Sequence, residues 1–251
     1  MRALARTCQH AAGVSLTLGH PRLHLRSTGS TSDRARALAI AGAPHGTLVT
    51  ASEQTAGRGR QGRRWSAPPE RSLLMSLVLH RPPSLLPLIA AVAVCDVVGE
   101  DAQVKWPNDI VFVRPPDTHG EGALAKLAGI LAEGRPQEGW AVLGIGLNVA
   151  VQLDELPGEL RTTAATLGAS PEAIEPMLAR LLAALGRRLA EPTEALLDAY
   201  RARDALHGRE IEWLGGRGLA DGIDGEGRLV VALHGGGHTA LDAGEIHLRR
   251  L

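Results

Sequence analysis

Three long apolar segments place the strongest constraint on how this 251-residue chain folds. Residues 72–80 (SLLMSLVLH), 124–133 (LAKLAGILAE) and 140–150 (WAVLGIGLNVA) have the length and the aliphatic content of β-strands. Aromatic residues make up only 2% of the chain, so Leu, Val, Ile and Ala must build most of the core. The three segments therefore predict a sheet at the centre of the fold.

Helix signals and shorter strands surround this sheet. A Ser-Thr-Ser-Asp run followed by an Ala/Leu/Arg-rich stretch up to Gly42 predicts a capped helix, because such side chains cap helix N-termini and glycine ends helices. Further helices are predicted at 84–99, 171–189 and 192–206, and further strands at 22–27, 46–54 and on both sides of Pro107 within 102–113. This order predicts an α+β fold, with a mixed β-sheet flanked by helices.

The pattern of predicted secondary structure changes at about residue 207. From there to the end, short β segments are split by glycine-rich turns, which is typical of a small barrel. Residues 1–20 show no clean period. We therefore expect an N-terminal tail (1–20), a main domain (21–206) and a C-terminal module (207–251).

Charge and cysteine content exclude several classes of protein. Lys+Arg and Asp+Glu number 27 each, whereas dedicated nucleic-acid binders usually show a basic excess. Two cysteines cannot form a disulfide framework, and no Cys–His spacing indicates zinc. The longest apolar stretch (residues 84–98) is interrupted by Pro87 and Asp96, and the N-terminus lacks the apolar core of a signal peptide. We expect a cytoplasmic protein without membrane binding.

Residues 55–65, TAGRGRQGRRW, combine glycines with four arginines. Their spacing matches the G-x-G-x-x-G dinucleotide pattern, but prolines follow where that motif requires a helix. RNA-binding Arg–Gly segments usually occur as repeats with interleaved aromatics. In a third interpretation Arg58 and Arg60 turn inward around an anionic ligand, because guanidinium groups bind carboxylate and phosphate oxygens bidentately. A solvated surface turn is the plain alternative.

Two other segments favour the ligand-binding interpretation. In KWPND, Lys105 ends a strand beside a Trp-Pro hinge. A lysine at such a place can act as a point charge that neutralises the oxygens of a transferring phosphoryl or acyl group. Asn108 fits a ligand contact and an ordinary turn equally well. In GIGLN, Gly144 and Gly146 share one strand face and open the backbone to a ligand or a neighbouring strand, and Asn148 ends that strand.

Taken in order, STS, EQTAGRGRQGRRW, KWPND, KLAGILAE and GIGLNV resemble the biotin protein ligases. The resemblance runs from about residue 25 to the end, where GLADGIDGEGRLVV and GEIHLR are similar to the SH3-like C-terminal module of the family. The pair GRGRQGRRW and KWPND separates this family from lipoate ligases and aminoacyl-tRNA synthetases of related fold. The implied fold is of the class II aminoacyl-tRNA synthetase/biotin ligase type, with a small SH3-like barrel.

The resemblance implies roles for the matching residues. Lys105 is the expected principal catalytic group, with Arg58 and Arg60 beside it. Biotin is expected to contact Ser30, Thr31, Ser32, Gln54, Arg58, Gly59, Arg60, Lys105, Gly129, Gly144 and Gly146; Ser32 stands where the family has asparagine. ATP is expected to contact Arg58, Arg60, Arg63, Trp65, Asn108, Lys126 and Asn148. Trp65 fits adenine packing and a core anchor equally well, and no protein ligand to a metal is expected.

The implied activity is a two-step ligation. Biotin attacks the α-phosphate of ATP, with Mg²⁺, giving biotinyl-5′-AMP and pyrophosphate, and a lysine of a biotin carboxyl carrier protein then attacks the mixed anhydride. About 20 residues precede the ligase-like part, fewer than the roughly 50 of a domain, so neither repressor function nor nucleic-acid binding is expected. Either a monomer or a homodimer is compatible with the sequence. A lipoate-type ligase and an Arg–Gly RNA-binding module are the alternatives.

Overall fold

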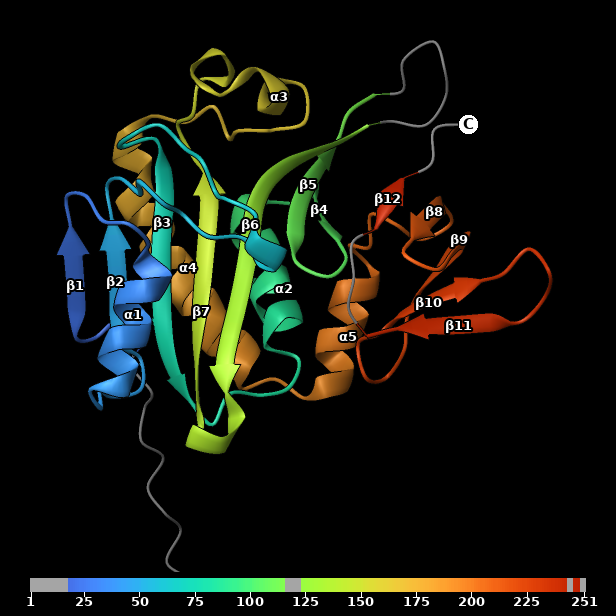
Figure 1. The fold of residues 1–251 in the computed structure, drawn as a ribbon, viewed down its shortest axis with the longest axis horizontal. Coiled ribbons are helices and arrows are strands. Elements are labelled where there is room, and N and C mark those ends of the chain that lie inside the picture. The colour runs from blue at the N-terminus through green and yellow to red at the C-terminus, as the bar shows by residue number, and fades with distance from the viewer. Residues whose placement is uncertain (1–17, 116–122, 243–245, 249–251) are drawn as a thin grey trace, which may run out of the picture.

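A seven-stranded sheet forms the centre of the molecule (Figure 1). The computed structural model describes residues 18–115, 123–242 and 246–248, so most of the expected N-terminal tail lies outside the described residues. The strand order is β1-β2-β3-β7-β6-β5-β4. The strands are β1 (Arg22–Leu25), β2 (Leu48–Ala51), β3 (Ser72–His80), β4 (Ala102–Lys105), β5 (Asp109–Val113), β6 (Leu124–Arg135) and β7 (Trp140–Asn148).

The three apolar segments of the sequence form the neighbouring central strands β3, β7 and β6, which confirms their prediction. β1 and β2 pair in parallel, and all other neighbours in this sheet pair antiparallel, so the sheet is mixed. The predicted strand 46–54 is shorter in the structure, since β2 covers only Leu48–Ala51. Gly146 of β7 pairs with Leu74 of β3 on one side and Gly129 of β6 on the other.

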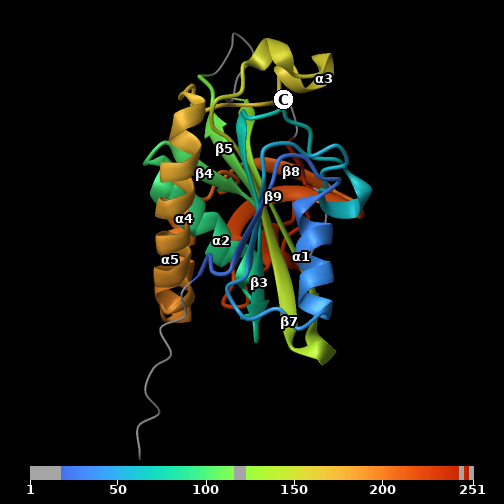
Figure 2. The same ribbon diagram turned by 90° about the vertical axis from the view of Figure 1, so that its left-hand side faces the viewer.

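Helices cover both faces of this sheet (Figure 2). α1 (Thr31–Ile40) lies on one face, and α2 (Leu86–Val98), α4 (Ile174–Leu189) and α5 (Thr193–Arg201) lie on the other, while the short α3 (Gly158–Arg161) follows β7. Ser30 caps α1 by accepting a hydrogen bond from the Ser32 N–H, as the Ser-Thr-Ser-Asp run predicts. Because α2 packs against α4, α5 and the sheet, it is buried on most sides.

The C-terminal segment forms a second, antiparallel sheet of order β11-β10-β9-β8-β12, consistent with the expected SH3-like module. Its strands are β8 (Glu210–Trp213), β9 (Gly216–Ile223), β10 (Leu229–Ala232), β11 (His238–Leu241) and β12 (His247–Leu248). The connection from α5 pairs with the edge of the large sheet: the Val104 N–H donates to the Arg203 carbonyl at 2.7 Å, and the Ala205 N–H to the Val104 carbonyl at 2.9 Å. No described helix has the length and apolar character needed to cross a bilayer.

Residues 57–65 fold back on themselves, and we call them the Arg–Gly hairpin. The Gly59 N–H donates to the Arg63 carbonyl at 2.7 Å, and the Trp65 N–H to the Gly57 carbonyl at 2.9 Å. Gln61 turns the chain in the left-handed region, with φ of 55°. The next α-helix begins only at Leu86, so the hairpin does not open the helix that a dinucleotide fingerprint requires.

Trp65 docks the hairpin onto the central strands. A Cβ atom added at Gly146 would lie 2.5 Å from Cε2 of the indole, and one added at Gly129 would lie 3.1 Å from Cζ3. The indole can pack against the backbone of β6 and β7 only because both positions lack a side chain. Its Nε1 atom is buried and has no hydrogen-bond partner within the described chain.

This packing predicts that Gly146→Ala weakens the docking of the hairpin. The added methyl group overlaps the indole, so the free energy of unfolding should fall by about 1–3 kcal/mol. In a Trp65→Ala background the same change should cost far less, because the overlapping ring is gone. Urea unfolding of the four proteins of this double-mutant cycle gives the coupling free energy.

Gly186→Ala is the matched control, since a Cβ at Gly186 of α4 would meet nothing within 4 Å. It should leave stability unchanged or raise it slightly. An equal cost of Gly146→Ala with and without the indole would show that Trp65 is not what requires a glycine there.

Candidate active site

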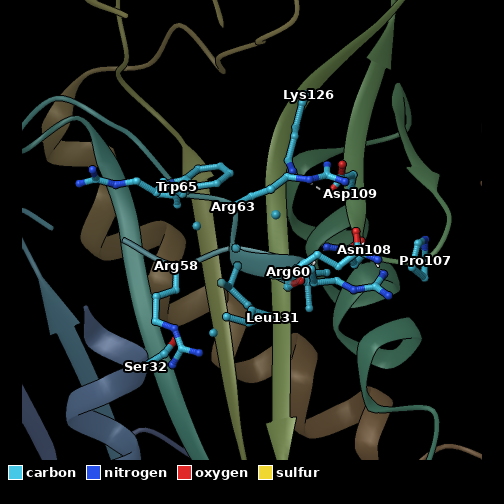
Figure 3. A pocket seen from close by; sticks show the side chains of 18 of the residues that line it. Ser32, Arg58, Arg60, Arg63, Trp65, Pro107, Asn108, Asp109, Lys126 and Leu131 are labelled. Atoms are coloured by element: carbon cyan, nitrogen blue, oxygen red, sulfur yellow. Dashed lines mark hydrogen bonds and ion pairs between the residues drawn. The ribbon is translucent and has the colours of Figure 1, made fainter. Parts of the chain in front are cut away.

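The Arg–Gly hairpin closes a cavity of about 130 Å³ over β6, β7 and the β4–β5 turn (Figure 3). Of the predicted site residues, those that line it are Thr31, Ser32, Gln54, Arg58, Gly59, Arg60, Arg63, Trp65, Lys105, Asn108, Lys126, Gly129, Gly144 and Gly146. Segments from five parts of the chain therefore meet at one place. Ligand pockets usually measure about 300–1,000 Å³, and the cavity is smaller because the hairpin and its indole lie inside the opening.

Hydroxyl and amide groups line the end of the cavity beside α1, next to the Arg58 side chain (Figure 3). The side-chain carbonyl of Gln54 accepts from the Thr31 N–H at 2.7 Å and from the Thr31 hydroxyl at 2.9 Å. The Ser76 hydroxyl donates to Thr31 Oγ1 at 2.8 Å and lies 3.1 Å from Ser32 Oγ. A chain of hydroxyl and amide groups thus holds Thr31, Ser32 and Gln54 in fixed orientations, ready to bind a neutral polar ligand group.

Gly144 makes room for this network. A Cβ atom at Gly144 would lie 2.7 Å from Ser32 Oγ and 3.5 Å from Ser76 Oγ. The glycine that alternates with Gly146 on β7 therefore faces the hydroxyl groups, while Gly146 faces the indole. The Ser32 hydroxyl and the Trp65 indole lie over these two glycines, and contact of the glycines with a ligand stays a prediction.

Cationic groups form the opposite end of the cavity. The whole chain has two lysines, Lys105 and Lys126, and both line the cavity. Lys126 Nζ lies 2.7 Å from Asp109 Oδ1 and 5.8 Å from the centre of the Trp65 ring, a cation–π distance. Because positively charged residues elsewhere in this chain are arginines, the placement of both lysines here indicates a site that uses compact point charges.

Arg60 reaches toward this cationic end. Its Nη1 donates to Asn108 Oδ1 at 3.1 Å, while Asn108 is itself fixed to β6, donating from Nδ2 to the Ile130 carbonyl at 2.9 Å. Partial burial lowers the pKa of Arg60 from its ordinary value, and the nearby Asp109 carboxylate opposes this shift. Since arginine titrates far above neutral pH, the group keeps its charge in a partly desolvated setting, which favours pairing with an anion.

Arg58 points the other way, toward Ser32 at the start of α1 (Figure 3). Its Nη1 lies 2.7 Å from Asp33 Oδ1 and its Nη2 lies 2.7 Å from Glu133 Oε1. The two arginines of the hairpin therefore face opposite sides of the cavity. The expectation that Arg58 contacts ligand oxygens stays a prediction, and in this structure both of its Nη atoms bond to protein carboxylates.

The KWPND turn is held by the C-terminal module. Trp106 is 2% exposed, and its Nε1 donates to the Gly227 carbonyl at 3.0 Å. A Cβ at Gly227 would lie 2.9 Å from the side chains of Leu85 and Leu88, so a close approach of the β9–β10 turn to α2 sets this hydrogen bond. The module thereby fixes the residue between Lys105 and Pro107, and Ile246 of the same module lines the cavity.

Two predicted site residues lie outside the cavity lining. The Ser30 side chain caps α1. Asn148 is buried, where its Oδ1 accepts from Ser72 and its Nδ2 donates to the Ala165 carbonyl at 2.9 Å. Their contact with biotin or ATP stays a prediction.

Sequence reasoning missed three residues that lie behind the cavity lining and orient Thr31 and Arg58. Ser76 interrupts an otherwise apolar strand, a signal that could have identified it, because buried hydroxyl groups need partners. Asp33 and Glu133 carry no such signal, since a carboxylate in the first turn of a helix or near the end of a strand is ordinary. The part of the chain that the structure describes holds no group of three His, Cys, Asp or Glu side chains able to bind a metal ion.

Comparisons with known proteins match this pocket-bearing region. Residues 25–149 match the model of the biotin/lipoate A/B protein ligase family. The chain is 35% identical over 245 residues to the biotin--[acetyl-CoA-carboxylase] ligase of Mycobacterium tuberculosis, covering 88% of this chain and 87% of the relative. It is 32% identical over 228 residues to the ligase of the same name from Paracoccus denitrificans, covering 80% and 90%.

A bifunctional ligase/repressor from Bacillus spizizenii is 35% identical over 226 residues, and the chain spans 66% of its length. The biotin protein ligase of Aquifex aeolicus, solved in complex with biotin and ATP, superposes with a TM-score of 0.74 at 25% identity, covering 92% of this chain and 100% of that one. The family model covers the hairpin and the central strands, and the Aquifex structure covers 92% of the chain. The chain belongs to the biotin/lipoate A/B protein ligase family, among its biotin protein ligases.

Proposed function

We propose that this protein activates biotin with ATP to biotinyl-5′-AMP and transfers the biotinyl group to a lysine of a biotin carboxyl carrier protein. The observation that carries the proposal is the polarity of the cavity. At one end lie the hydroxyl and amide groups of Thr31, Ser32 and Gln54, beside Arg58, whose charge is paired with Asp33 and Glu133; at the other end lie Arg60, Lys105 and Lys126. Biotin has the same order of groups, with a neutral ureido ring, an apolar chain and a carboxylate.

The hydroxyl network favours biotin over lipoate. A dithiolane ring offers no hydrogen bonds to Thr31, Ser32 and Gln54, so lipoate would leave these groups unpaired when it displaces water. Sites that hydrogen-bond a polar ligand group reject an analogue that lacks it by large factors, on the order of 10⁴. The same three residues that hold the ureido ring would thus set specificity.

In the first step, the ionised carboxylate of biotin attacks the α-phosphate and pyrophosphate leaves. No proton has to be removed from this nucleophile, so the main demand is neutralisation of charge on the transferring group. Lys105 at the end of β4 and Arg60 from the hairpin lie on the side where this charge develops, and fixed cations in a dry site are effective there.

In the second step, a lysine amine of the carrier attacks the acyl carbon of the anhydride, an amide bond forms, and AMP and a proton are released. The hairpin over the cavity would keep water from the anhydride until the carrier arrives. Trp65, which packs on the two glycines, would form part of that cover. The small volume of the closed cavity implies that the hairpin opens to admit substrates.

Magnesium fits this site as an ion that arrives with the nucleotide. Mg²⁺ usually keeps several waters and binds through substrate phosphates with one or two protein oxygens. At the cationic end, Asn108 Oδ1 accepts from Arg60 and Asp109 Oδ1 pairs with Lys126, so these oxygens would hold the ion once Arg60 and Lys126 turn to the phosphates. When bound, the ion would neutralise phosphate charge and favour departure of pyrophosphate.

Pyrophosphate exchange tests the proposed function directly. Protein, ATP, Mg²⁺ and labelled pyrophosphate are incubated with biotin or with lipoate, and label in ATP is counted. Exchange should require biotin and stay at background with lipoate. Exchange that depends on lipoate instead would overturn the assignment. When a carrier domain is added to the biotin reaction, the mass of the carrier should increase by that of one biotinyl group.

The RNA-binding alternative receives little support from the hairpin. Arg58 bonds to Asp33 and Glu133, Arg60 bonds to Asn108, and Arg64 donates to the Thr55 carbonyl at 2.8 Å. Side chains engaged in this way are not presented as an open basic strip. The absence of nucleic-acid binding and of repressor activity stays a prediction, which a salt-dependent gel shift with single-stranded RNA and with duplex DNA would check.

Lys105→Ala should lower the rate of biotin-dependent pyrophosphate exchange by at least about 100-fold, since one fixed charge at a reacting oxygen contributes that much. Thermal unfolding should stay near that of the parent. Gln103→Ala, two residues earlier on β4, controls for disturbance of the strand and should keep its activity. A Lys105→Ala protein with near-normal exchange would remove this residue from the mechanism.

Arg60→Gly should loosen closure of the hairpin and let biotinyl-5′-AMP escape, because the bond to Asn108 is lost. The escaped anhydride would acylate lysines of a bystander protein, measured by mass spectrometry. Gln61→Gly controls for a glycine placed in the same turn without loss of the Arg60–Asn108 bond, since φ of 55° at Gln61 suits glycine. Bystander labelling that rises equally in both variants would assign the effect to flexibility.

A further inference from the structure

Four charged side chains close a ring at the edge of the cavity. Asp33 and Arg36 come from α1, Glu133 from β6 and Arg58 from the Arg–Gly hairpin. Arg58 Nη1 lies 2.7 Å from Asp33 Oδ1, and Arg58 Nη2 lies 2.7 Å from Glu133 Oε1. Arg36 Nη2 lies 2.7 Å from Glu133 Oε2, and Arg36 Nη1 lies 3.9 Å from Asp33 Oδ1.

This ring is incomplete without the hairpin. Asp33, Arg36 and Glu133 belong to the rigid scaffold of helix and sheet, and alone they carry two negative charges and one positive charge. Arg58 supplies the fourth member and makes the ring neutral. The carboxylates of Asp33 and Glu133 each lie 2.7 Å from a different Nη atom of Arg58. A guanidinium group can bind two carboxylates through its two Nη atoms in this fixed geometry, whereas the single ammonium group of lysine cannot.

The partners of Arg58 are only partly exposed. The Glu133 side chain is 27% exposed and that of Asp33 is 55% exposed. Glu133 uses one oxygen for Arg36 and the other for Arg58, so its position is fixed from two sides. Ion pairs of this kind contribute more than isolated surface pairs because the carboxylate is already ordered before the arginine arrives.

We propose that Asp33 and Glu133, oriented by Arg36, are positioning residues that hold the Arg–Gly hairpin closed through Arg58 and so set how long the acyl-adenylate stays in the site. The part about the adenylate rests on the proposed function; the holding of the hairpin does not. In this account Arg58 anchors the hairpin to α1 and β6, and Arg60, on the opposite side, faces the reacting groups.

Limited proteolysis of the ligand-free protein tests the anchor by itself. The hairpin contains four arginines, so trypsin cuts it when it opens, and the fragment masses identify cleavage after residues 58–64. Glu133→Gln should raise the rate of this cleavage by about three- to tenfold, and Asp33→Asn by a smaller factor because that carboxylate is more exposed. Glu138→Gln is the matched control, since its carboxylate pairs with Arg135 and does not contact the hairpin.

Retention of the adenylate tests the consequence for the reaction. Biotinyl-5′-AMP formed in the site is chased with unlabelled biotin and ATP, and its release is followed. Glu133→Gln should speed release by a similar factor of about three to ten, while pyrophosphate exchange at saturating substrates stays within about twofold. If Glu133 only supported the fold, its substitution would change the rate of adenylate release and the rate of pyrophosphate exchange together, or change neither.

The outcomes separate the two claims. Cleavage and release that stay at the parent rate in Glu133→Gln and Asp33→Asn, or that rise equally in Glu138→Gln, would overturn the anchor. Faster cleavage at the hairpin in a protein that forms no adenylate would support the anchor and refute the proposed function. Adenylate formation together with unchanged cleavage in the variants would support the proposed function and refute the anchor.

Discussion

The packing of one indole ring on two glycines is the contact on which the site depends. Trp65 lies against the backbone of β6 and β7 because Gly129 and Gly146, which pair across these strands, carry no side chain. This contact fixes the end of the Arg–Gly hairpin to two central strands of the sheet. With that end fixed and the hairpin closed by its own backbone bonds, Arg58 and Arg60 reach opposite walls of the cavity.

The sheet supplies the rest of the site in an order that follows from its topology. β2 and α1 bring the neutral groups to one side, and β4, β5 and β6 bring the lysines and Asp109 to the other. The C-terminal module supports the charged side through Trp106 and Gly227. Under the proposed function, the neutral ring of biotin would lie against the first side and its carboxylate against the second, once the hairpin opens to admit it.

Much of the fold could be predicted from local sequence patterns, because apolar strands and capped helices leave short-range signals. The central strands, the buried α2, the hinge at Pro107 and the glycine alternation on β7 all carry such signals. The partners of Arg58 do not: Asp33 and Glu133 are 25 and 75 residues away, and only the register of β6 against β7 brings Glu133 to the cavity. The structural use of Asn148 was hidden for the same reason, since it bonds to Ser72 and Ala165, which the fold places beside it, whereas the Ser30 cap is local and was predicted.

The most direct measurement is a crystal structure of this protein with biotinyl-5′-AMP bound. The account predicts the hairpin closed, with the ureido ring against Thr31 and Gln54 and the phosphate within hydrogen-bond distance of Lys105 and Arg60. An adenylate bound with the hairpin open and Lys105 turned away from the phosphate would contradict it, as would a reversed ligand whose phosphate meets the neutral end.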